Sequence, residues 1–124
     1  MKRMILILIF LIISVLMYSE DDSLFKRLKG SWIYGNDYEG YYSVTFENFQ
    51  GRRRILFLMF KNGKTDCFEY NIYEVRKKEI SCYSVYSIDI NAGNYKKING
   101  GCYVDYVFID NALRIFNIPF IREK

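Results

Sequence analysis

After residue 30, apolar and polar residues alternate along most of the chain, which is the pattern of β-strands buried on one face. In segment 41–49, for example, Tyr42, Val44 and Phe46 share one face, and mostly polar residues occupy the other. Asn62-Gly63 is a typical two-residue hairpin turn between two such segments. The expected strands are 31–34, 41–49, 53–60, 66–75, 79–90, 101–109 and 113–117, with 120–122 as an eighth strand or a kinked continuation of the seventh.

The short connections between these segments indicate antiparallel pairing between neighbours in the sequence. Seven or eight strands in an up-and-down order leave two exposed edges unless the sheet closes on itself. We therefore expect an all-β fold, an antiparallel meander that closes into a small barrel. The alternative is a sandwich with a Greek-key crossing, for which only the expected loop 91–100 is long enough.

The N-terminal segment differs from the rest of the chain. Lys2 and Arg3 precede an apolar run from Met4 to Met17, and polar residues begin at Ser19. This order is typical of a secretory signal peptide, and the run is shorter than the roughly 20 residues of a membrane-spanning helix. We expect residues 1–19 to be a signal peptide and 20–124 to be one exported domain, periplasmic or extracellular, with a retained signal anchor as the alternative.

A short helical turn is expected over residues 22–29, directly before the motif Gly30-Ser31-Trp32. The turn, the motif and the meander resemble the lipocalins and the wider calycin families, and most of all their short bacterial lipocalin-like domains. The resemblance implies that Gly30 and Trp32 begin the first strand and that Trp32 packs across a closed end of the barrel. It also implies a basic residue over the indole, for which Arg114 and Arg122 are the candidates.

Charge and residue usage exclude several classes of function. The chain has 18 basic and 14 acidic residues; without Lys2 and Arg3 the formal charge is +2, too low to indicate a nucleic-acid-binding protein. It has no histidine, which removes the commonest general base and metal ligand. We expect no enzymatic activity, no metal, no cofactor, and no membrane span once the signal is removed.

The three cysteines are Cys67, Cys82 and Cys102. Strand parity places Cys82 and Cys102 inside and Cys67 outside, and a loop over 91–100 would bring Cys82 opposite Ile109. We therefore expect three unpaired thiols; one disulfide with one remaining thiol is the alternative in an oxidising compartment.

Most charged residues are expected to lie on the solvent-exposed surface. Glu69, Asp89 and Asp105 fall on the outward parity of their strands, so we expect them to be exposed. The basic triplets 52–54 and 76–78 occupy expected turns, where they keep the surface soluble or form a patch for an anionic partner.

Tyrosine is abundant and suits contact with a ligand or a partner, because it combines an apolar ring with a hydroxyl group. One hypothesis is a barrel that binds a small apolar or aromatic ligand at a mouth rimmed by loops 35–40, 61–66 and 91–100. The alternative is a non-enzymatic interaction module with a packed core, which contacts a protein or envelope partner. The candidate ligand-binding residues are Tyr38, Tyr41, Tyr42, Tyr70, Tyr86, Tyr95 and Tyr106.

Overall fold

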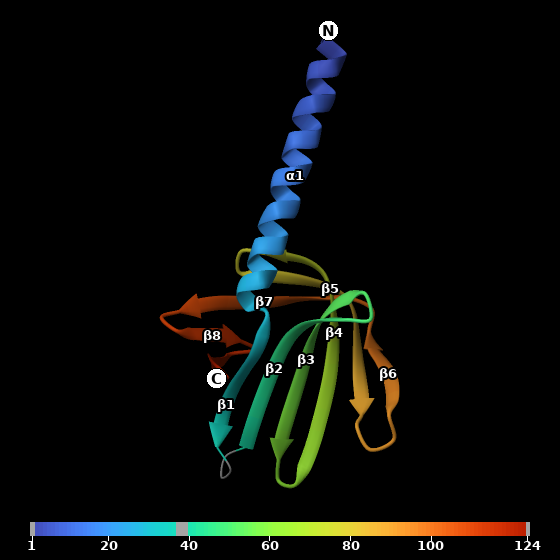
Figure 1. Cartoon of the computed structure of the whole chain (residues 1–124). Coiled ribbons are helices and arrows are strands. Elements are labelled where there is room, and N and C mark those ends of the chain that lie inside the picture. The colour runs from blue at the N-terminus through green and yellow to red at the C-terminus, as the bar shows by residue number, and fades with distance from the viewer. Residues whose placement is uncertain (1, 37–39, 124) are drawn as a thin grey trace.

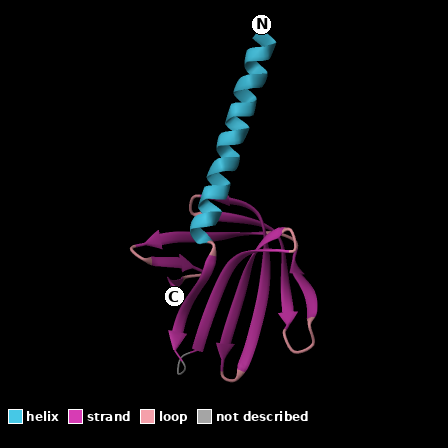
Figure 2. Ribbon diagram, viewed as in Figure 1, coloured by secondary structure: helices cyan, strands magenta, loops and turns pink. Residues whose placement is uncertain are grey.

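The computed structural model describes residues 2–36 and 40–123, which form one long helix and an antiparallel β-barrel (Figure 1 and Figure 2). The helix α1 spans Lys2–Leu28. The strands in this part of the chain are β1 Gly30–Asn36, β2 Gly40–Phe49, β3 Arg52–Lys61, β4 Lys64–Arg76, β5 Glu79–Asp89, β6 Asn94–Asn99, β7 Cys102–Ile109, β8 Ala112–Ile115 and β9 Ile118–Arg122.

The expected meander and its closure are confirmed. Neighbouring strands pair in the order β1 to β5, continue through β7, β8 and β9, and close where β9 pairs with β1. The connection between β3 and β4 and that between β5 and β6 lie at the end of the barrel remote from α1 (Figure 1). The barrel is therefore an all-β, up-and-down structure, as the alternation of the sequence predicted.

The segment 91–100 is not the plain loop that we expected, because it contains β6. After Cys82, β5 changes its partner: its first part pairs with β7, and its second part, from Val85, pairs with β6. The polar sequence of β6 gives no alternation to reveal a strand, and all of its residues are exposed. This exchange of partners also overturns the expected position of Cys82, which lies directly opposite Cys102.

Two bulges change which side chains of β4 and β5 face outward. Asn71 pairs with Ser84, whereas Ile72 pairs with Cys82 and Glu74 with Ser81, so Tyr83 and Tyr73 have no partner in the ladder. One extra residue inverts the parity of every residue beyond it. The assignment of Tyr86 to the inward face was therefore wrong: it lies opposite Glu69 on the outer face of the sheet.

The C-terminal strands also differ from the expected segments. The predicted strand 113–117 ends early, because Phe116 and Asn117 have positive φ angles of 54° and 60° and form a turn. The chain then continues into β9, which pairs with both β8 and β1. The last expected segment is thus a separate strand, and it closes the barrel.

The helix α1 is longer than the expected turn at 22–29, which forms only its C-terminal part. Residues Ile5 to Ile12 are exposed, and this part of the helix projects away from the barrel (Figure 1). Near the other end Phe25 and Leu28 are buried in the barrel core, and the Asp21 carboxylate accepts hydrogen bonds from Arg53 and from the Val75 amide. In the described part of the chain, no helix has both the length and the hydropathy of a membrane span.

Trp32 and Arg122 form a compact arrangement where α1 meets the barrel. The buried indole donates a hydrogen bond from Nε1 to the Leu28 carbonyl at 2.9 Å, and the Arg122 guanidinium lies 4.2 Å from the ring centroid. Arg122 also donates to the carbonyls of Arg27 and Lys29, whose oxygens lie at the unsatisfied C-terminal end of the helix. A Cβ on Gly30, at φ +118°, would lie 3.1 Å from Arg122 Nη1.

The other basic candidate, Arg114, is exposed on β8 opposite Pro119, so Arg122 is the residue that covers the indole.

Apolar and aromatic side chains pack against one another inside the barrel. Phe46, Ile55, Ile80, Leu113 and Phe120 are fully buried. Phe57 packs against Phe116 at 4.8 Å between ring centroids, and Phe116 packs against Tyr70 at 5.3 Å. Tyr42 and Phe68 stack on the same phenylalanine ring, that of Phe57. Close packing of rings across the interior identifies it as a core of the kind that stabilises small barrels.

Candidate functional site

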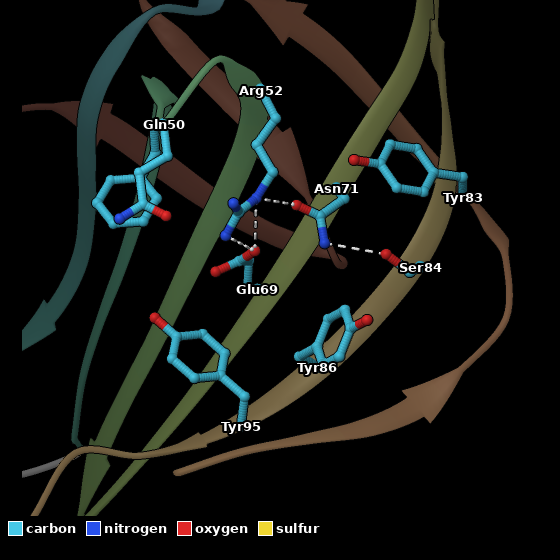
Figure 3. Close-up of a pocket in the computed structure, with 9 residues that line it drawn as sticks. Gln50, Arg52, Glu69, Asn71, Tyr83, Ser84, Tyr86 and Tyr95 are labelled. Carbon is cyan, nitrogen blue, oxygen red and sulfur yellow. Dashed lines mark hydrogen bonds and ion pairs between the residues drawn. The ribbon is translucent and has the colours of Figure 1, made fainter. Parts of the chain in front are cut away.

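A cavity of about 470 Å³ lies on the outer face of the barrel, over β3, β4 and β5 and bordered by β6 (Figure 3). Its floor consists of outward-facing side chains of β4, whose alternate residues, such as Tyr70 and Ile72, face the core. Its volume is in the range of small-molecule sites in proteins. The lining residues are Phe49, Gln50, Arg52, Glu69, Asn71, Tyr83, Ser84, Tyr86 and Tyr95.

Glu69 is the centre of the cavity floor, and only 1% of it is exposed. Its Oε1 accepts hydrogen bonds from Arg52 Nε at 3.2 Å and from Arg52 Nη2 at 2.8 Å, and its Oε2 accepts one from Arg54 Nη1 at 2.8 Å. These charged hydrogen bonds compensate for the removal of the carboxylate from water. The expectation that Glu69 is exposed was wrong, because two arginines of the neighbouring strand cover it; Asp89 and Asp105 are exposed as expected.

Arg54 joins a second carboxylate to this centre, because its Nε also donates to Glu47 Oε1 at 2.8 Å. Burial by itself would lower the pKa of the Arg54 guanidinium, but the hydrogen bonds and charges of Glu47 and Glu69 outweigh burial and raise that pKa. Arg54 therefore stays a cation. The cluster of two arginines and two glutamates has no net charge, so it does not by itself favour an anionic ligand.

A chain of hydrogen bonds crosses the cavity floor from β3 to β5. Arg52 Nε donates to Asn71 Oδ1 at 2.9 Å, and Asn71 Nδ2 donates to Ser84 Oγ at 2.9 Å (Figure 3). Asn71 and Ser84 are buried and are paired directly across the two strands. Because each side chain holds its neighbour, the polar groups of the floor are fixed before any ligand arrives.

Aromatic rings surround this polar floor. Tyr86 and Tyr95 meet edge to face, with 6.4 Å between their ring centroids, and the Phe49 ring lies 3.7 Å from the Arg54 guanidinium. Tyr83, at the bulge of β5, is 49% exposed, and its ring extends over the cavity toward Asn71 (Figure 3). The site thus combines fixed hydrogen-bonding groups with apolar ring faces.

Of the tyrosines that the sequence suggested as ligand contacts and that the structure describes, Tyr86 and Tyr95 line the cavity. Tyr42 and Tyr70 belong to the interior aromatic packing, and burial is the main cause that raises the pKa of Tyr70. Tyr106 is buried near α1, where its hydroxyl donates to the Arg76 carbonyl at 2.5 Å and burial raises its pKa.

Two further tyrosines of the suggested set lie elsewhere. Tyr41 is half-buried on the outer face of β2, opposite Phe60, and Tyr38 lies outside the described residues.

Sequence reasoning missed the polar floor itself. The triplet 52–54 was assigned to a charged turn, but Arg52, Arg53 and Arg54 belong to β3, and each forms an ion pair with a carboxylate. A signal was present, because arginines at 52 and 54 share a parity on one strand and Glu69 and Asn71 share a parity on its hairpin neighbour. Arg54 faces Asn71, so Glu69 lies diagonally across from Arg54, and opposite charges at such neighbouring positions of a hairpin indicate a cross-strand ion pair.

The described residues offer this site little catalytic chemistry. Both oxygens of the Glu69 carboxylate accept hydrogen bonds from arginine, so the group already has partners within the protein. Among the residues that the structure describes, no three side chains of His, Cys, Asp or Glu gather as metal ligands. The arrangement can hold a ligand through hydrogen bonds and ring contacts. Comparison of the chain with protein-family models, with curated proteins and with solved structures gives no match.

Proposed function

We propose that the chain is an exported, lipocalin-like binding protein without catalytic activity, and that its ligand binds in the outer cavity rather than inside the barrel. The observation that carries the proposal is the fixed polar floor of Arg52, Glu69, Asn71 and Ser84 beneath three tyrosine rings. A concave site with a few convergent polar groups and aromatic walls is the usual form of a small-molecule site.

The chemistry of the cavity favours a neutral ligand with several hydroxyl groups and an apolar ring face, such as a saccharide. The cluster of arginines and glutamates is neutral overall. The hydrogen bonds of Arg52 use its Nε and Nη2, which leaves the two protons of Nη1 to donate to a ligand. The tyrosines supply ring faces together with hydroxyl groups, so they suit a ligand whose edge is polar and whose face is apolar.

A small apolar ligand in the barrel mouth is less well supported. The rings of Tyr42, Phe57, Tyr70 and Phe116 pack against one another where that molecule would sit. Export is proposed from the sequence, since Lys2 and Arg3 precede an apolar run and polar residues follow it.

A second candidate function is the interaction module, and exposed tyrosines favour it. Tyr73 is 69% exposed and Tyr103 is 71% exposed, both outside the cavity. Exposed tyrosine is enriched in protein-binding surfaces because a rigid ring gives a large contact area at a small entropic cost.

A glycan array followed by isothermal titration calorimetry tests the proposal, with Tyr83→Ala and Tyr103→Ala as matched variants. Both tyrosines are exposed on the barrel, but only Tyr83 lines the cavity. We expect saturable binding of at least one glycan, a loss of affinity of about tenfold in Tyr83→Ala, and none in Tyr103→Ala. Absence of saturable binding, or equal losses in the two variants, would overturn the saccharide proposal and favour the interaction module.

A further inference from the structure

Cys82 and Cys102 lie where β5 exchanges its ladder partner β7 for β6, a point that we call the fork of the sheet. They are directly opposite each other on β5 and β7, and they form the last pair of that ladder before β5 turns to its other partner, β6. Both residues belong to the interior: Cys82 is part of the buried core, and Cys102 is half-buried and packs against it. The two thiols therefore share one face of two adjacent antiparallel strands.

This placement meets the geometric requirement of a disulfide. Residues directly opposite in an antiparallel pair have Cα atoms about 4.5–5.5 Å apart, within the range of about 4.4–6.8 Å that disulfides span. Cβ atoms at directly opposite positions are about 4.5–5.5 Å apart, and those of a disulfide are about 3.5–4.5 Å apart, so the bond requires an approach of about 1 Å.

We propose that Cys82 and Cys102 form a disulfide in the exported protein and that Cys67 stays a thiol. Cys67 lies on the outer face of β4, opposite Ile88, so the sheet separates it from the other two cysteines. The proposal concerns the fork of the sheet and does not depend on the identity of any ligand.

The oxidant is a disulfide compound, either a protein disulfide or oxidised glutathione. The Cys102 thiolate attacks one sulfur of that compound, which forms a mixed disulfide and releases one thiolate. The Cys82 thiolate then attacks Cys102 Sγ, which forms the Cys82–Cys102 bond and releases the second thiolate. The two cysteines lose two electrons and two protons in all, and the reagent takes up both as two thiols.

The buried position predicts when the bond forms. Burial raises the pKa of the Cys82 thiol to about 12 and also raises that of Cys102, so the folded, reduced protein holds almost no thiolate at neutral pH. Thiolate is the reactive form, so oxidation of the folded protein is slow. The bond therefore forms during folding, while the two thiols are still accessible.

The cross-link would fix the hairpin that carries one wall of the outer cavity. It closes a loop over residues 83–101, which includes the second part of β5 and all of β6. Tyr83, Ser84, Tyr86 and Tyr95 of the cavity belong to this loop. Oxidation thus restrains β6, whose one ladder partner among the described strands is β5.

A peptide map of the refolded full chain tests the bond. The chain is unfolded and reduced, refolded with reduced and oxidised glutathione, alkylated under denaturing conditions and digested with trypsin without reductant. Cleavage after lysine and arginine separates Cys67, Cys82 and Cys102 into peptides 65–76, 79–96 and 98–114. We expect 79–96 joined to 98–114, and peptide 65–76 alkylated.

Single substitutions give the matched controls. Cys67→Ser should keep the linked peptide, whereas Cys82→Ser should remove it and leave Cys102 alkylated. Alkylation of all three cysteines in the wild-type map, or a link that contains Cys67, would overturn the proposal. The two outcomes that would overturn the proposal are read from the wild-type map, so the test holds even where a cysteine variant does not fold.

Discussion

Replacing Glu69 with glutamine tests whether the buried carboxylate holds the cavity floor together. The substitution keeps the size of the side chain but removes its charge and turns one acceptor oxygen into an amide group that donates hydrogens. That amide would face guanidinium groups, which also only donate. Either the hydrogen bonds from Arg52 or that from Arg54 must then be lost.

The structure sets the size of the effect. Removing one partner of a buried ion pair typically costs about 3–5 kcal/mol, because the other charge stays buried and unpaired. Here the loss is partly compensated, since Arg54 keeps its ion pair with Glu47 and 32% of the Arg52 side chain is exposed to water. We therefore expect Glu69→Gln to lower the free energy of unfolding by about 2–4 kcal/mol.

Urea unfolding followed by circular dichroism measures this difference, with Glu74→Gln as the matched control. Glu74 lies on the same strand and pairs with Arg76, but 62% of the Arg76 side chain is exposed. Exposed pairs contribute little, so the control should unfold close to the wild type. If Glu69→Gln destabilised the protein no more than Glu74→Gln, the argument that burial makes the Glu69 contacts strong would be refuted.

Three further predictions concern other parts of the molecule. Trp32→Ala should lower the free energy of unfolding by about 3–5 kcal/mol, because it removes a large buried ring and the surface on which Arg122 lies; wild-type stability in urea would contradict this. N-terminal sequencing of the native protein should find Glu20 as the first residue, and an intact Met1 would contradict cleavage. Burial, followed by the Cys102 thiol, raises the pKa of Cys82 from 9.0 to about 12. The neutral Cys82 thiol therefore contributes stability below pH 9 that is lost as the pH rises toward 12. In reductant, the free energy of unfolding of the wild type should fall relative to that of Cys82→Ala between pH 9 and pH 12. Parallel plots of unfolding free energy against pH for the two proteins would contradict this.

The sequence predicted the barrel because its strongest signals were local. The alternation of β2 indicated a strand, and the turn at Asn62-Gly63 indicated the hairpin of β3 and β4. That turn also sets the register in which Arg54 faces Asn71. Gly30 and Trp32 marked the start of β1, since a residue with a Cβ at position 30 would crowd Arg122. Each of these inferences depends on a few adjacent residues.

The positions that the sequence missed depend on partners distant in the chain. Parity along β5 assumed an unbroken ladder, and the unpaired Tyr83 inverted it, which moved Tyr86 to the outer face. The parity of its own strand predicts Glu69 on the surface, and that parity does not reveal the ion pairs with Arg52 and Arg54 that accompany its burial. The polar strand β6 forms because β5 offers it an edge, which no pattern within residues 94–99 encodes.

The irregularities of β5 explain why a barrel with a packed interior still has a cavity on its outside. The bulge at Tyr83 turns Ser84 toward Asn71 and projects the Tyr83 ring over the floor, whereas a regular ladder would direct Ser84 into the core. The change of partner from β7 to β6 then lets β6 place Tyr95 beside Tyr86. The interior rings stabilise the barrel, and the change of partner along β5 shapes the cavity. Core packing and the cavity therefore lie on opposite faces of the same sheet. Substitutions on the cavity wall, such as at Tyr83, can therefore change binding without disturbing the core, and this separation makes the matched tyrosine variants a clean test of function.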